Sequence, residues 1–306
     1  MRKKIKILIT DKIDLSNIKI LPKSQFTVDV NFGISNYAIL KSKVTYDGII
    51  IRSTRIIDEA FLNKCKLKLI ATCSKGVDHI DVSFAKKKKI EVINCLEGNN
   101  ISTAEHTMGL LLTIYKKICY SDSLVRNRRF NDFNFNRREL FGKKIGNIGI
   151  GKVGSHVVKL SQVFGMEVFA NDIDKEVRKK IAHLQFKSLN YILRHSDIIT
   201  LHIPLDKKNY NFISKEKLNL INPESVLINT SRGRILDEKH LIKLLRQKKI
   251  AFAGLDVFHN EPDINKDFFK LDNVILTNHI AGKTQESIEK IAKDVFEQVK
   301  YFFVKN

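Results

Sequence analysis

Short apolar runs alternate with longer stretches of helical pattern along most of the chain. In the first third, the runs that predict buried strands lie at residues 5–10, 46–52, 67–73 and 90–95. A second series of such runs lies at residues 144–150, 167–172, 197–202, 225–230, 251–257 and 273–279. Because parallel strands joined by crossover helices have this rhythm, the pattern predicts an α/β protein with parallel sheets.

Two long helices are expected beside these series of strands. Residues 100–119 have a helical pattern, in which Ser102 is expected to cap the first turn and Glu105 to complete a capping box. Residues 121–140, rich in Arg and Asn, predict a surface excursion. The last helix is expected at 283–304, with these apolar residues on one face: Ile288, Ile291, Val295, Val299 and Phe302.

The chain of 306 residues is long enough for two domains, and 43% of its residues are apolar. No run of eighteen apolar residues occurs, so we expect no membrane span. The apolar run near the N-terminus is short and is followed at once by Asp11 and Lys12, which favours an opening strand over an export signal. We therefore expect a cytoplasmic protein.

Cysteine spacing and charge narrow the function classes. The four cysteines show no C-x-x-C spacing and no His/Cys cluster, so we expect free thiols and no metal site. The formal charge is +21, but lysine is spread along the whole chain together with Ile and Asn, as in proteins from AT-rich genomes. Steering of small phosphorylated anions is an alternative. No nucleic-acid-binding signature occurs, so a nucleic-acid partner is not expected.

A glycine pattern predicts a dinucleotide site. Gly149, Gly151 and Gly154 form G-x-G-x-x-G between a predicted strand and a predicted helix, and the next strand ends at Asp172. Backbone N–H groups and the helix N-terminus would receive a pyrophosphate, and Asp172 would accept hydrogen bonds from the adenosine ribose. Because a carboxylate at that place disfavours a 2′-phosphate, the pattern favours NAD over NADP.

Three later predicted strands break into loops that carry Arg232, Glu261 and His279. In an open α/β sheet, ligands bind beyond the carboxyl ends of the strands. A guanidinium binds a carboxylate with two hydrogen bonds, and an imidazole takes a hydroxyl proton near neutral pH. A carboxylate beside the imidazole orients it and favours its protonated form. Together these residues predict the oxidation of a hydroxy acid.

From about residue 46 to the C-terminus, the sequence resembles the D-isomer-specific 2-hydroxyacid dehydrogenases, on the motifs NTSRG, LDVFHNEP and TNHIAG. The resemblance implies two flavodoxin- or Rossmann-like lobes and a homodimer formed through the cofactor lobe. The NAD-binding lobe, residues 101–282, would be inserted into a substrate lobe of residues 1–100 and 283–306. Arg232, Glu261 and His279 would be the catalytic set.

The resemblance also implies further contacts with NAD. Lys152 and Val153 would present backbone N–H groups to the pyrophosphate, and Asp256 would hold the nicotinamide amide. Other residues expected at the cofactor are Ile203, Thr230 and Gly282.

Within the family, the segments IIRSTRI, GVDHID and EGNNISTAEHT look most like 3-phosphoglycerate dehydrogenases, in a short form without a C-terminal regulatory domain. That likeness implies that Arg52 and Ser53 meet the substrate's phosphate or its neighbourhood, and that backbone groups of Lys75 and Gly76 hold its carboxylate near Asn99.

Two positions depart from the family pattern: Thr72 stands where Arg is common, and Asn278 where Pro is usual. Erythronate-4-phosphate dehydrogenase and glyoxylate or hydroxypyruvate reductase therefore remain alternatives. An NAD-sensing, corepressor-like binding protein is an alternative of another class.

Overall fold

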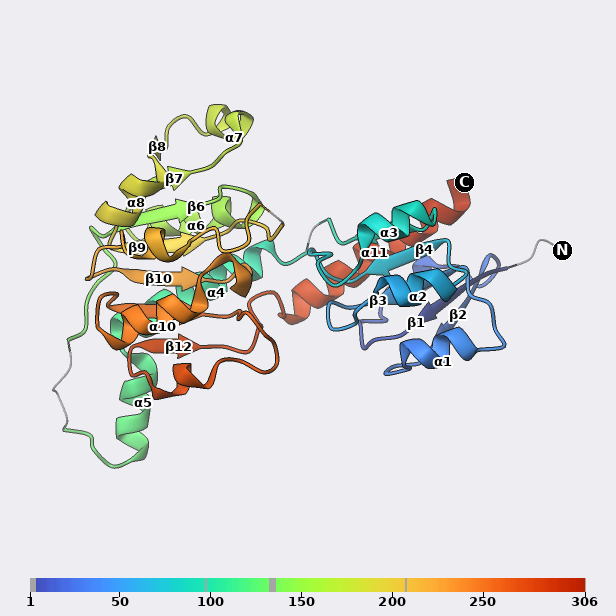
Figure 1. The fold of residues 1–306 in the computed structure, drawn as a ribbon, viewed down its shortest axis with the longest axis horizontal. Helices are drawn as coiled ribbons and strands as arrows, with labels where there is room; N and C mark the ends of the chain where they lie inside the picture. The colour runs from blue at the N-terminus through green and yellow to red at the C-terminus, as the bar shows by residue number, and fades with distance from the viewer. Residues whose placement is uncertain (1–3, 97, 132–135, 207, 306) are drawn as a thin grey trace. The chain divides into compact units, whose positions relative to one another are not determined.

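Two parallel sheets, each with helices on both faces, organise the chain. The computed structural model describes residues 4–96, 98–131, 136–206 and 208–305. The chain forms two units, one of Met1–Asn99 with Lys283–Asn306 and the other of Asn100–Gly282 (Figure 1). The second unit is thus inserted into the first along the sequence, which confirms the predicted fold class.

The first unit contains a five-stranded parallel sheet in the order β2-β1-β3-β4-β5. Its strands are β1 (Ile5–Ile9), β2 (Phe26–Val30), β3 (Gly48–Ile51), β4 (Leu69–Thr72) and β5 (Glu91–Asn94). Strand β2 was not predicted. It lies at the edge of the sheet and buries only Phe26, so it lacks the continuous apolar run of its neighbours.

The helices of the first unit are α1 (Asn36–Lys41), α2 (Glu59–Lys64), α3 (Val82–Lys87) and α11 (Gln285–Lys305), with a 3₁₀ turn at Ile18–Ile20. Helix α11 packs Ile291, Val295 and Val299 against one face of the sheet. The short helices α1 to α3 cover the other face, against Ile49 and Ile70. The predicted C-terminal helix is therefore present and anchors the chain's end to the first sheet.

The second unit contains a seven-stranded parallel sheet in the order β12-β11-β10-β9-β6-β7-β8. Its strands are β6 (Lys144–Ile148), β7 (Glu167–Asn171), β8 (Gln185–Phe186), β9 (Ile198–Leu201), β10 (Val226–Asn229), β11 (Phe252–Leu255) and β12 (Val274–Leu276). Strand β8 was not predicted, because its two residues are too few to form a pattern.

The helices of the second unit are α4 (Asn100–Lys116), α5 (Ile118–Arg126), α6 (Lys152–Val163), α7 (Lys175–Lys180), α8 (Leu189–His195), α9 (Lys215–Leu218) and α10 (Glu238–Arg246). Short 3₁₀ turns lie at Gly233–Ile235 and Lys266–Lys270. Helices α4 and α6 pack on one face of the sheet, and α8 to α10 pack on the other. Among the described residues, no helix is both long and apolar enough to cross a bilayer.

Two expectations about the region after residue 100 are wrong. The helix expected at 100–119 breaks at Lys117, whose φ of 54° lies in the left-handed region, and α5 then includes part of the expected excursion. Ser102 does not cap the helix, since α4 already begins at Asn100. Instead, the buried Ser102 hydroxyl donates to the carbonyl of Ala281 at 2.6 Å.

Candidate active site

The glycine loop joins β6 to α6 through a tight turn, in which two of the three glycine positions leave no room for a side chain. Gly149 has a φ of +91°, and a Cβ there would lie 2.8 Å from the carbonyl oxygen of His202. A Cβ on Gly154 would lie 2.0 Å from the carbonyl oxygen of Gly149. Gly151 is exposed and precedes the first turn of α6. The loop is thus tightly packed at Gly149 and Gly154 and open at Gly151. Gly151 lies at the N-terminus of α6, a position suited to a phosphate group.

Asp172 follows β7 and binds the glycine loop directly. Its Oδ2 accepts a hydrogen bond from the N–H of Ile150 at 2.7 Å, and its Oδ1 accepts from the N–H of Asp174 at 2.8 Å. A carboxylate oxygen has capacity for a further donor, so these bonds leave room for a ribose hydroxyl. The glycine cradle and this carboxylate fit an NAD molecule.

Three further residues expected at the cofactor lie in or beside this loop. Lys152 is exposed and Val153 is half-buried in the first turn of α6. Ile203 contacts the loop, since its Cγ2 would lie 2.8 Å from a Cβ on Gly149. The adjacent imidazole of His202 has a buried Nε2 without a partner among the described residues, and burial lowers its pKa to about 4. His202 is therefore neutral at pH 7.

Arg232 lies in the loop that follows β10, and Asn229 fixes the shape of this loop. The buried Asn229 side chain accepts hydrogen bonds from the N–H of Ser231 at 3.0 Å and from its hydroxyl at 2.7 Å. The same side chain donates to the carbonyl of Arg232 at 2.9 Å. The half-buried Arg232 guanidinium donates to the carbonyl of Ser231 at 2.8 Å.

Gly233 brings the Arg232 loop against the loop that carries Glu261. A Cβ on Gly233 would lie 2.0 Å from the carbonyl carbon of Phe258, so only glycine permits this approach. The N–H of Phe258 in turn donates to Oε1 of Glu261 at 2.9 Å. The structure thus brings together the loops of two predicted catalytic residues.

His279 and Glu261 form a hydrogen-bonded pair. The Nδ1 atom of His279 lies 2.6 Å from Oε2 of Glu261, and the two side chains are 38% and 34% exposed. Burial alone would raise the pKa of Glu261, but hydrogen bonds from His279 and Phe258 and the charges of His279 and Arg232 lower it below its ordinary value. Glu261 is therefore ionised at neutral pH, and Nε2 is the ring nitrogen of His279 left for proton exchange.

Asp256 holds the loop that carries His279. This fully buried carboxylate accepts hydrogen bonds from the hydroxyl of Thr277 at 2.6 Å and from the N–H groups of Ile280 and Ala281, each at 2.9 Å. The Asp256 carbonyl also accepts from the N–H of His279 at 2.9 Å. These bonds hold His279 at a φ of +56°.

Helix α4 supports the same loops with residues to which the sequence analysis gave no role. His106 places Nε2 3.0 Å from the Thr277 hydroxyl and 3.5 Å from Oδ1 of Asp256. Thr107 lies within hydrogen-bond distance, 3.0 Å, of Thr230, which is buried. The stretch that contains His106 contributed to the family resemblance, so a signal was present in the sequence.

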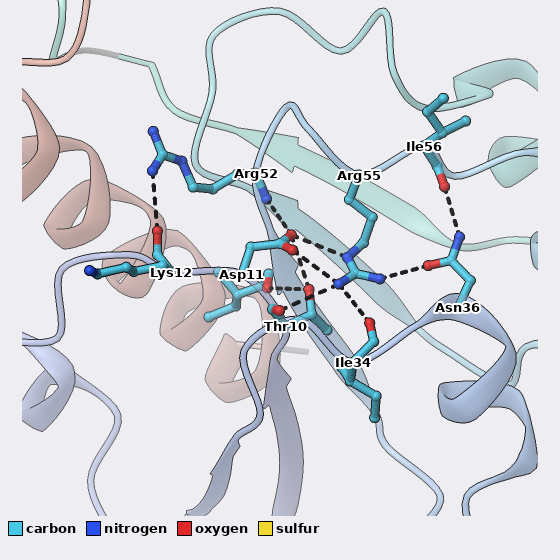
Figure 2. Close-up of polar contacts among 9 residues, drawn as sticks. Thr10, Asp11, Lys12, Ile34, Asn36, Arg52, Arg55 and Ile56 are labelled. Atoms are coloured by element: carbon cyan, nitrogen blue, oxygen red, sulfur yellow. Dashed lines mark hydrogen bonds and ion pairs between the residues drawn. The ribbon is translucent and has the colours of Figure 1, made fainter. Parts of the chain in front are cut away.

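The residues expected at the substrate lie in the first unit, beyond the carboxyl ends of its central strands. Arg52 and the exposed Ser53 follow β3. The backbone N–H of Arg52 donates to Oδ2 of Asp11 at 2.9 Å, and its guanidinium donates to the carbonyl of Lys12 at 3.2 Å (Figure 2). Asn99 comes after β5, directly before α4.

Lys75 and Gly76 lie in the loop after β4, and polar side chains hold this loop. Asn94 donates to the carbonyl of Lys75 at 2.5 Å, and the Ser74 hydroxyl donates to that of Gly76 at 2.8 Å. Thr72, which stands at the family's Arg position, has its hydroxyl 2.8 Å from the Ser74 hydroxyl. Thr72 therefore stabilises the loop but supplies no positive charge.

Comparison with known proteins identifies the second unit as a domain of a known family. Residues 108–281 match the sequence model described as "D-isomer specific 2-hydroxyacid dehydrogenase, NAD binding domain". D-3-phosphoglycerate dehydrogenase of Methanocaldococcus jannaschii is 35% identical over 97% of this chain, which spans 57% of that relative's length. Glyoxylate reductase of Pyrococcus horikoshii is 34% identical over 95% of this chain and 92% of its own length.

A solved structure shows the same fold. D-lactate dehydrogenase from Aquifex aeolicus, complexed with NAD and lactic acid, has a TM-score of 0.84 and 28% identity, over 97% of this chain and 95% of the other. The glycine loop, the sheet topology and these sequence matches all indicate the same family. The chain therefore belongs to the D-isomer specific 2-hydroxyacid dehydrogenase family.

Proposed function

We propose that this protein interconverts a phosphorylated D-2-hydroxy acid and its 2-oxo acid with NAD as the cofactor. The leading substrate is 3-phosphoglycerate, oxidised to 3-phosphohydroxypyruvate in serine biosynthesis. The observation that carries the proposal is the His279–Glu261 hydrogen bond of 2.6 Å, in the unit that also holds the glycine loop and Arg232.

The proposed chemistry assigns one task to each side chain. The Arg232 guanidinium binds the substrate carboxylate with paired hydrogen bonds and orients the 2-hydroxyl group. The Nε2 atom of His279 takes the hydroxyl proton, and the ionised Glu261 stabilises the imidazolium that forms. NAD, when bound, accepts the hydride from C2. In the reverse direction, His279 returns the proton to the 2-oxo group.

Asp256, buried and bound to the His279 loop, has a positioning task in this proposal. Its bonds to Ile280 and Ala281 fix the backbone on which the imidazole sits. Glu261 fixes the ring itself through Nδ1. Both constraints reduce the reorganisation needed before proton transfer.

A phosphorylated substrate is supported by the likeness to D-3-phosphoglycerate dehydrogenases and by the position of Arg52 beyond the end of β3. A glyoxylate or hydroxypyruvate reductase is the second candidate. Thr72, which lacks the charge of the family's Arg, favours it, as does the match along 92% of a glyoxylate reductase. We also propose a cytoplasmic homodimer formed through the second unit, on the basis of the family resemblance.

The test is a substrate panel with purified protein. NADH formation is measured with 3-phosphoglycerate, D-glycerate and D-lactate, and NADH consumption with hydroxypyruvate and glyoxylate. The proposal predicts the highest kcat/KM for 3-phosphoglycerate. A higher value for glyoxylate would support the second candidate, and NAD binding without turnover of any substrate would contradict both. Light scattering after size-exclusion chromatography tests the dimer.

A further inference from the structure

A dense polar cluster lies at the carboxyl edge of the first sheet, centred on Arg55. Its guanidinium donates through Nε to Oδ2 of Asp11 at 3.1 Å and through Nη2 to Oδ1 of Asp11 at 3.0 Å. It also donates to Oδ1 of Asn36 and to the carbonyl of Ile34, each at 2.8 Å (Figure 2). The side chains of Arg55 and Asp11 are only 10% and 14% exposed. A two-pronged, largely buried ion pair of this kind has a fixed geometry.

Asp11 connects this ion pair to Arg52. Its Oδ2 accepts the N–H of Arg52 at 2.9 Å, and the N–H of Arg55 donates back to the carbonyl of Arg52 at 3.1 Å. Asp11 therefore holds both ends of the 52–55 segment, through the backbone N–H of Arg52 and the side chain of Arg55. The hydrogen bond between Arg55 and Arg52 closes the turn between them. This segment begins at Arg52, whose position supports a phosphorylated substrate in the proposed function.

The Arg52 side chain leaves the cluster instead of joining it. Figure 2 shows it extending away from Arg55 toward Lys12. Within the described part of the chain, its guanidinium makes one hydrogen bond, to the Lys12 carbonyl. Because a guanidinium has five N–H donors, most of its donors remain for an anion.

The charge of Asp11 explains why Arg55 matters. Asp11 already binds the backbone of Arg52, so an uncompensated carboxylate there would attract the Arg52 guanidinium as well. Arg55 engages both carboxylate oxygens and neutralises them. Asp11, the carboxylate that binds the backbone of Arg52, is therefore paired with Arg55 and does not draw the Arg52 guanidinium from its outward position.

We propose that Arg55 and Asp11 are positioning residues for an anion site at Arg52. The side-chain oxygen of Asp11 holds the backbone N–H of Arg52, and pairing with Arg55 keeps the Asp11 charge from capturing the Arg52 guanidinium, so that Arg52 binds a phosphate group of the substrate. This inference rests on the proposed function, which gives Arg52 that role.

The test compares Arg55→Ala, Asp11→Asn, the double variant and Arg52→Ala. Lys68→Ala is the matched control, since Lys68 pairs with Asp47 at 3.0 Å in the same unit and is 67% exposed. The measurements are kcat and KM for 3-phosphoglycerate at saturating NAD, and calorimetric binding of inorganic phosphate, which does not depend on turnover. Thermal melting shows whether each variant is folded.

We expect Arg55→Ala to raise KM and the phosphate Kd about tenfold or more, with kcat changed by no more than about twofold. The double variant is expected to recover most of this loss, because its neutral Asn no longer competes for Arg52. A purely structural role predicts the opposite, a double variant as impaired as Arg55→Ala or more so. Lys68→Ala is expected to change neither quantity.

Arg55→Lys keeps the charge without the paired geometry, and serves if Arg55→Ala does not fold. We expect it to bind phosphate within about threefold of wild type, because it still neutralises Asp11; a loss as large as that of Arg52→Ala would overturn the inference. If Arg52→Ala weakens phosphate binding but Arg55→Ala does not, the inference fails while the proposed function stands. If Arg52→Ala has no effect, the assignment of Arg52 fails and the inference with it.

Discussion

Nδ1 of His279 lies 2.6 Å from Oε2 of Glu261. Hydrogen bonds and nearby positive charges lower the pKa of Glu261, so Glu261 is negatively charged at neutral pH. The pair therefore holds the imidazole ring in one orientation and compensates the charge that the ring acquires when it takes a proton. We expect this pair to carry out the catalytic proton transfer.

Glu261→Gln is expected to lower kcat about 10- to 100-fold, because the imidazolium loses a charged hydrogen-bond acceptor. Binding of NAD is expected to change little, since the Glu261 carboxylate bonds to His279 and Phe258 and not to the glycine loop. Steady-state kinetics and calorimetry measure the two effects. A variant with unchanged kcat would show that Glu261 does not act on the reacting proton.

Gly154→Ala is expected to weaken NAD binding about tenfold or more, because its Cβ would lie 2.0 Å from the Gly149 carbonyl oxygen and must displace the loop. Gly109→Ala is the matched control: it lies in α4 with nothing within 4 Å of an added Cβ. This control should bind NAD normally and be more stable by about 0.5–1 kcal/mol. Equal NAD affinity in both variants would refute the role of the glycine loop.

Asp172→Ala is expected to shift the ratio of NAD to NADP affinity about tenfold toward NADP, because a 2′-phosphate no longer meets a carboxylate. Glu176→Gln, in the exposed first turn of α7, is the control and should leave the ratio unchanged. Fluorescence titration with both dinucleotides gives the ratio. If Asp172→Ala leaves the preference intact, another group discriminates between the cofactors.

His202 is expected to make stability depend on pH. Burial lowers its pKa from 6.5 to about 4, so the folded protein binds fewer protons than the unfolded chain between these values. Its contribution to stability is complete above pH 6.5 and is lost as the pH falls toward 4, by about 3 kcal/mol in all. Urea unfolding of wild type and His202→Gln at pH 7 and pH 4 measures this: wild type should lose more stability on acidification than the variant. Equal losses would contradict the burial argument.

Patterns along the sequence predicted the strands that form apolar runs, including the edge strands β5 and β12, which are not fully buried. Edge strands β2 and β8 lack such runs and were missed. The break at Lys117 was also missed, since nothing in the local pattern opposes a continued helix. Ser102 has the residue type of a cap, but its hydroxyl bonds to Ala281, a partner 179 positions away that only the fold reveals.

For the candidate site, the positions of the main residues could be predicted from the sequence, but the hydrogen bonds that hold them could not. The positions of Arg232, Glu261 and His279 in loops after strands could be predicted because each follows an apolar run, while their catalytic role remains the proposal. The networks that hold them could not, since Asp256 and His106 meet at Thr277 only after α4 packs beside β11 and β12. The pairing of Arg55 with Asp11 likewise joins residues 44 positions apart.

The most direct test of the central claim uses His279→Asn, because Asn tolerates the positive φ found at this position. NADH formation from 3-phosphoglycerate and the rest of the substrate panel is followed by ultraviolet absorbance, with NAD affinity measured in parallel. We expect turnover by wild type and a loss of about 10²- to 10⁴-fold in the variant at unchanged NAD affinity. Equal turnover by the two proteins, or NAD binding by wild type without any turnover, would contradict it.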